Sequence, residues 1–170
     1  MERIIAAILS NIFVPLFIIA VIVAMVKMRS LQSRSEKFDV FLAELVFYGV
    51  GLGGIWAFIA HAIGTAAHIG WAPSPFEWEL AFITLGVAVI AVAQLWTGRP
   101  YRVATAIITI IFFWGCAVQH VNQIMCCRNY APGNAALVLY WDIIFPLILL
   151  VALIASRPKA SATLQSRSSA

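Results

Sequence analysis

Long apolar stretches separated by short polar segments dominate this sequence. Residues 4–26, 80–98 and 103–127 contain no Asp, Glu, Lys or Arg, and a further apolar run reaching residue 156 is interrupted only by Asp142. A fifth stretch, residues 40–70, carries Glu44 and two histidines. Each is long enough for the roughly 20 helical residues that cross a hydrocarbon core about 30 Å thick. The pattern predicts an all-α polytopic membrane bundle of five transmembrane helices, at about residues 4–26, 40–69, 75–97, 102–127 and 135–156.

Composition supports a membrane protein over a soluble domain. Hydrophobic residues make up 63% of the chain and charged residues 11%, with a mean hydropathy of +0.97. A secretory signal peptide is the alternative for the first stretch, but such peptides have a shorter apolar region followed by small residues. Here the apolar run is longer and ends next to Lys27 and Arg29. We therefore expect a retained helix.

The positions of the basic residues predict the orientation. Nine of the eleven Lys and Arg residues lie in the first loop, the third loop and the C-terminal segment, and only Arg3 and Arg128 lie on the other side. Because positive charge resists translocation, this asymmetry predicts an outer N-terminus and a cytoplasmic C-terminus. The sequence pI near 9.3 then reflects topology and not nucleic-acid binding. We expect one bundle over residues 1–156, a disordered cytoplasmic tail over 157–170, and the lipid bilayer of a cell membrane as its surroundings.

Local motifs predict several helix boundaries. Ser74, Pro75 and Glu77 form the pattern of a capping box, in which Glu77 reaches back to the residue that caps the helix. Asn134 follows a Pro-Gly turn and is placed to cap the last helix. The glycines at positions 49–54 should let a neighbouring backbone approach the second helix closely.

Polar residues inside the apolar stretches are the candidate functional residues. At about 100° per residue, His61 and His68 share one stripe of the second predicted helix, and Gln119, His120 and Gln123 share one face of the fourth. Counting helical rise from the predicted outer ends puts His61 at a depth of about 12 Å and His120 and Asp142 at about 10 Å. The predicted site in the outer half comprises His61, His120, Asp142, Glu79, His68, Gln119 and Gln123.

Ionisable groups within the membrane are costly and usually face a partner or a cavity, and three functional hypotheses follow. His61, His120 and Asp142 suit a transition metal such as zinc, copper or iron. His61 and His120 could instead be axial ligands of a haem held between the second and fourth predicted helices. The third hypothesis is a proton or small-solute path. Against all three stands a structural interpretation, in which these side chains only tie helices together by hydrogen bonds.

Other polar residues have simpler explanations. Glu44 is expected to pair with a basic group near the inner face, for which Arg102 is a candidate. Cys126 and Cys127 could form a strained disulfide, pair with another chain or stay as thiols, whereas Cys116 is too far along the helix to reach either. No hydrolase, phosphate-binding or zinc-protease motif is present, so the sequence gives no argument for an enzyme.

The order of the motifs resembles a known family. Gly70-Trp71, Ser74-Pro75-Phe76-Glu77, Gly115 with His120, Asn129-x-Ala-Pro-Gly-Asn134 and Asp142 together resemble a family of small bacterial multi-pass membrane proteins of unknown function, over about residues 40–155. The resemblance implies a membrane location and no activity, and for a bacterial protein we expect the inner membrane. The leading hypothesis is a membrane protein that binds a metal ion or small ligand. The alternatives are a small-solute or proton transport protein and a structural accessory subunit of a larger membrane complex. The predicted partners are a second copy in a homo-oligomer or another subunit of a membrane complex.

Overall fold

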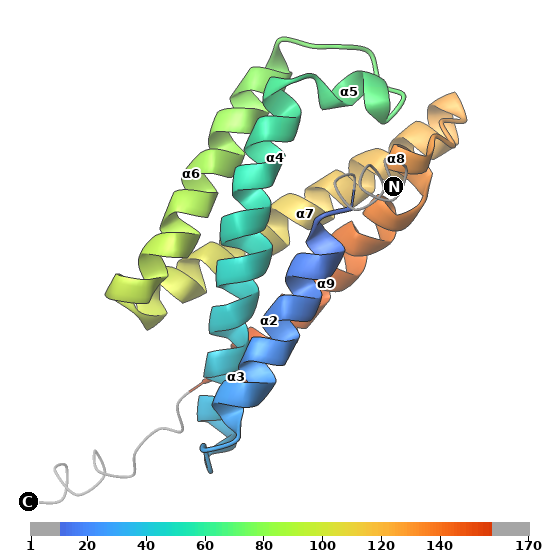
Figure 1. Ribbon diagram of the computed structural model, residues 1–170. Helices are drawn as coiled ribbons and strands as arrows, with labels where there is room; N and C mark the ends of the chain where they lie inside the picture. The colour runs from blue at the N-terminus through green and yellow to red at the C-terminus, as the bar shows by residue number, and fades with distance from the viewer. Residues whose placement is uncertain (1–10, 158–170) are drawn as a thin grey trace, which may run out of the picture.

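The computed structural model describes residues 11–157, and the regular secondary structure of that part of the chain is entirely helical (Figure 1). This confirms the all-α class. In chain order the elements are α2 (Phe13–Met28), α3 (Arg34–Glu44), the π-helix η1 (Leu45–Leu52), α4 (Gly53–Ala62), α5 (Thr65–His68), α6 (Phe76–Thr97), α7 (Arg99–Cys127), α8 (Pro132–Ala135) and α9 (Leu137–Ala155).

Four helical segments are long and apolar enough to cross a membrane. They are Arg34–Ala62, Phe76–Thr97, Arg99–Cys127 and Pro132–Ala155. The fifth apolar helix, α2, has 16 residues and begins at Phe13, and residues 4–10 of the predicted first span lie outside the described residues. Residues 158–170 of the predicted disordered tail lie outside them as well. The bundle is thus compatible with a lipid bilayer, while the number of spans and their orientation stay predictions.

The second span differs from its predicted bounds. It begins at Arg34 and ends at Ala62, whereas the sequence predicted residues 40–69. Gly64 takes a left-handed conformation with φ of +91°, which ends the helix and lets α5 start in a new direction. His61 therefore lies in the last turn of the span, and the depth of about 12 Å counted from residue 69 was wrong.

Two helix pairs form the frame of the molecule. α4 packs on α6, and α7 packs on α9, while α6 also contacts α7. In Figure 1 the two pairs diverge toward the end that carries α5 and α8, and α5 extends from α4 toward α8. We call this the α5–α8 end (residues 61–76 and 128–137), and we call the opposite end, with residues 27–39, 97–102 and 155–157, the arginine end.

The centre of the bundle is apolar. Leu42, Leu45, Phe145 and Leu149 are fully buried, and the Phe145 ring stacks on Trp141 at 4.6 Å between ring centroids. The predicted close approach to the glycine-rich segment is confirmed at Gly54, where a Cβ would lie 2.9 Å from the Cβ of Ala88 on α6. The described helices pack against one another mainly through these buried apolar side chains.

An ion network closes the arginine end. Arg102 forms an ion pair with Asp39 and donates to Gln94 Oε1 at 2.7 Å, and Gln94 donates to the carbonyl of Ala43 at 2.7 Å. Arg99 lies 3.3 Å from Asp39 as well. Glu44 is paired as expected, but its partner is Lys27 at 2.7 Å instead of Arg102. These contacts join α3, α6 and α7 through charges that can reach water at the membrane surface.

Candidate functional site

His120 of α7 and Asp142 of α9 face one another near the α5–α8 end. His120 Nε2 lies 3.5 Å from Asp142 Oδ2, and the two residues are 6% and 4% exposed. Both belong to the predicted site, and the packing of α7 on α9 brings them together although they are far apart in sequence. A buried carboxyl group next to an imidazole is the most polar contact in the described interior of this half.

Asn134 holds this pair from the other side of the imidazole ring. It is fully buried, and its Nδ2 donates to the carbonyl oxygens of His120 at 3.3 Å and of Asn129 at 2.9 Å. Its Oδ1 accepts from the indole Nε1 of Trp71 at 2.8 Å. Because an indole N–H can only donate and the two carbonyls can only accept, these contacts fix which end of the amide is oxygen.

The fixed amide also determines the tautomer of His120. His120 Nδ1 lies 2.8 Å from the same Asn134 Oδ1, so this nitrogen must carry a hydrogen in order to bond there. The Nε2 atom that faces Asp142 is then either a bare acceptor or a protonated donor. A single proton shared by Nε2 and the Asp142 carboxyl group satisfies both side chains. On Nε2 it gives an ion pair, and on the carboxyl group it gives a neutral acid beside a neutral imidazole.

Two loops cover the pair, and together they form what we call the lid (residues 69–71 and 129–134). The Trp71 ring lies 5.4 Å from the His120 ring between centroids. Asn129 Nδ2 donates to the carbonyls of Ile69 at 3.0 Å and Gly70 at 3.1 Å, which fastens one loop to the other. At Gly133 a Cβ would lie 2.8 Å from Ile69 Cγ2, so the loops meet at van der Waals distance.

The role of Asn134 was mispredicted from the sequence. It does not cap α9, which begins at Leu137 without a side-chain cap, but lies in α8 with its amide turned inward. Trp71, Asn129 and Asn134 were absent from the predicted site. The signal that could have found them was the motif itself, since Gly70-Trp71 and Asn129-x-Ala-Pro-Gly-Asn134 are the two lid segments.

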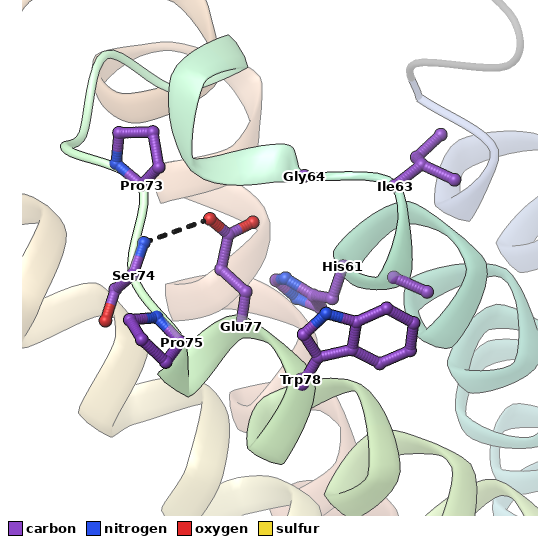
Figure 2. A pocket seen from close by; sticks show the side chains of 9 residues that line it. His61, Ile63, Gly64, Pro73, Ser74, Pro75, Glu77 and Trp78 are labelled. Atoms are coloured by element: carbon purple, nitrogen blue, oxygen red, sulfur yellow. Dashed lines mark hydrogen bonds between the residues drawn. The ribbon is translucent and has the colours of Figure 1, made fainter.

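His61 lies in a different place, in an open cleft of about 460 Å³ between α4 and the start of α6. Figure 2 shows its ring beside Glu77 and Trp78. Glu77 accepts from the backbone N–H of Ser74 at 3.5 Å and of Ala66 at 3.1 Å, and Ser74 Oγ accepts from the N–H of Phe76 at 3.3 Å. The predicted capping box is formed only in part: Glu77 reaches back to Ser74, but Ser74 Oγ accepts from Phe76 instead of Glu77, and α6 begins after Pro75 without a side-chain cap. Glu77 also holds the start of α5.

Within the described residues, none of the remaining predicted residues forms a hydrogen bond or ion pair with His120 or Asp142. Glu79, His68 and Gln119 are exposed, and Gln123 is half-buried with no side-chain hydrogen bond within residues 11–157. The buried face of α7 instead contains Thr109, Ala117 and His120. Adjacent residues on a helix are 100° apart, so burying His120 turns Gln119 outward.

The metal and haem hypotheses gain no support from this arrangement. Among the described residues no three His, Cys, Asp or Glu side chains form a group that could hold a metal ion. Both ring nitrogens of His120 already face protein atoms, so neither is free to ligate a haem iron. The three cysteines are free thiols, with Cys126 and Cys127 exposed.

Along α9, apolar residues separate the site from the arginine end. The buried face of α9 continues from Asp142 through Phe145, Pro146, Leu149 and Ala152 to Ser156, which accepts from Arg99. Helical rise over these 14 positions is about 21 Å. The side chains between the two polar clusters on this face are apolar and buried, so no polar path joins them along α9.

Comparison with known proteins gives a family but no relative of known activity. A family model described as a family of unknown function (DUF6790) matches residues 10–162. This agrees with the predicted resemblance to an uncharacterised family, and the matched region includes the α2 segment that the resemblance left out. No curated protein and no solved structure matches the chain.

Proposed function

The chain belongs to the DUF6790 family, whose function is unknown, and we propose that it is a membrane protein that takes up and releases one proton at the His120–Asp142 pair. In this proposal the α5–α8 end faces the outside, as the basic residues predict, and the lid links the charge state of the pair to the outer surface. In this proposal the site binds a proton, instead of the metal ion or small ligand that the sequence suggested.

One observation carries the proposal, namely the hydrogen bond from His120 Nδ1 to Asn134 Oδ1 at 2.8 Å. It leaves Nε2 as the only ring nitrogen that can change its protonation state, and that atom faces Asp142 at 3.5 Å. With one proton the pair is electrically neutral. Without that proton, the Nε2 lone pair faces the Asp142 carboxylate and the pair has a net negative charge. With a second proton, a buried imidazolium faces a neutral carboxylic acid, so each of these two states carries an uncompensated buried charge.

Exchange with one side of the membrane fits this site better than conduction across it. The lid covers the pair at the α5–α8 end, whereas along α9 the apolar core lies between the pair and the arginine end. A proton that crossed the bundle would need polar groups or water over about 21 Å along α9. The transport alternative therefore has less in its favour than a one-sided proton site.

The lid gives the protonation state a structural consequence. Asn134 Oδ1 accepts from both Trp71 and His120, and Asn129 fastens the Trp71 loop to the same segment. A change in the charge or position of the His120 ring alters a hydrogen bond that Trp71 shares. We therefore expect external pH to change how tightly the lid packs.

The test is a pH titration of the histidine nitrogens by NMR in protein labelled with ¹⁵N-histidine. His61→Gln simplifies the spectrum, and His68→Gln assigns the signal of the exposed His68. We expect His120 Nδ1 to stay protonated throughout while Nε2 changes state, and Asp142→Asn to move that transition. A His120 ring that keeps one state over the whole pH range of the folded protein, or a titration indifferent to Asp142→Asn, would reduce the pair to a structural tie.

A further inference from the structure

The outward face of α7 carries a heptad pattern along its whole length. Exposed residues alternate at spacings of three and four, as in the a and d positions of a coiled coil: Tyr101, Ala104, Ile108, Ile111, Gly115, Val118, Asn122 and Met125. Within the same helix the buried residues, such as Thr109, Ala117 and His120, occupy the opposite side. We call the exposed row the α7 seam.

Two amide side chains make the α7 seam a poor surface for lipid. Asn122 lies in the seam and Gln119 beside it, and neither has a side-chain hydrogen bond within the described part of the chain. They lie about 7 and 12 Å from the end of α7 by helical rise. Lipid tails offer no hydrogen bond, so an amide that contacts them costs free energy that a protein partner would recover.

Gly115 opens the middle of the seam to another helix. A Cβ at this position would meet no atom within 4 Å, so the glycine is not needed for packing inside the monomer. Small residues in membrane helices let a second helix approach closely, and neighbouring Asn or Gln side chains then bond across the contact. Gly115 and Asn122 are both a positions of the seam, one heptad apart.

We propose that the α7 seam is the contact between two copies of this chain, related by a two-fold axis along the membrane normal. Two copies inserted with the same topology place their α7 helices parallel, so Asn122 of one copy faces Asn122 of the other. An amide both donates and accepts, and it therefore pairs with an identical amide without any other partner group. This self-complementarity favours a second copy over a different protein.

The first test compares two glycines that are equally open in the monomer. A Cβ at Gly86, on α6, also meets nothing within 4 Å, so Gly86→Leu and Gly115→Leu should both fold. In lipid bilayers, with energy transfer between labelled copies as the measure of association, we expect Gly115→Leu to weaken the dimer by at least about tenfold and Gly86→Leu to leave it unchanged. Asn122→Leu should weaken it by about 3- to 20-fold, the range for hydrogen bonds between membrane helices.

The second test is disulfide cross-linking in native membranes, in a chain with all three cysteines replaced by serine. Val118→Cys lies in the seam, and Ile144→Cys on α9 is the control outside it, because Val118 and Ile144 are both exposed, at 69% and 50%. Oxidation should link Val118→Cys into dimers and leave Ile144→Cys monomeric. If lipid covers the seam instead, neither cysteine variant should cross-link, and the two glycine variants should associate equally. This outcome would overturn the proposal.

Discussion

Trp71 donates its indole hydrogen to Oδ1 of Asn134 at 2.8 Å, although the two residues are 63 positions apart in the chain. The same oxygen accepts from His120 Nδ1, so three segments converge on one amide group. This contact links the loop before α6 to the turn before α9, and both segments meet His120 at the same amide. The proposed site therefore depends on a residue that is itself unable to titrate.

Replacing Asn134 with Leu should strongly destabilise the protein. The variant leaves the donors of Trp71 and His120 and the carbonyls of His120 and Asn129 without their partner. Each unsatisfied buried group costs about 1 to 3 kcal/mol, so we expect a loss of at least about 3 kcal/mol in the free energy of unfolding, measured by denaturation in detergent micelles. Gln123→Leu, which removes an amide without a side-chain bond in the described chain, should change it by less than about 0.5 kcal/mol.

Stability should depend on pH through the His120–Asp142 pair. When alkaline pH removes the shared proton, a carboxylate faces the Nε2 lone pair, and the folded state loses stability. Asp142→Asn has no carboxylate, so its alkaline loss should be smaller than that of the unaltered protein. Thermal unfolding of both proteins across a pH series checks this, and parallel curves at high pH would contradict it.

Asp39→Asn should weaken the arginine end. Asp39 is the carboxylate partner of both Arg99 and Arg102, and Arg102 keeps only 14% of its side chain exposed. We expect a loss of about 1 to 3 kcal/mol, less than for a fully buried pair because Asp39 is 29% exposed. The control is Glu36→Gln, an exposed acid on the same helix, and equal effects of the two substitutions would show that the ion pairs contribute little.

Gly54→Ala tests the close contact of α4 with α6. Its Cβ would lie 2.9 Å from Ala88 Cβ and 3.2 Å from the carbonyl of Thr84, so one helix must move. Overpacking of this kind costs about 1 to 3 kcal/mol. Gly86→Ala has open space around the new methyl group and should instead stabilise the helix slightly, by about 0.5 to 1 kcal/mol, so the two substitutions should differ in sign.

The apolar pattern predicted the helical class and the four ends of two spans well. The predicted spans at 75–97 and 102–127 lie within three residues of Phe76–Thr97 and Arg99–Cys127, because Pro and Gly mark those boundaries. The end of the second span was missed, since Gly64 stands in an apolar stretch where a left-handed turn has no marker besides the glycine itself.

The candidate site was half predicted. His120 and Asp142 were found because intramembrane charge is rare, and helical rise placed them at similar depth. His61 was grouped with them through a depth count from a helix end that does not exist, and it lies beside Glu77 instead. The lid could not be derived from local patterns, because Asn134 and Trp71 meet only through the packing of distant segments.

The π-helical turns of η1 set the phase of the second span. α3 packs against α2 and α9 on one side of η1, and α4 packs against α6 on the other, so one continuous segment serves two different neighbours. Removing a single residue from Leu45–Leu52 would rotate everything after it by about 100° relative to α3. Gly54 would then leave Ala88, and His61 would swing away from Glu77, so the length of this segment is as constrained as any side chain in it.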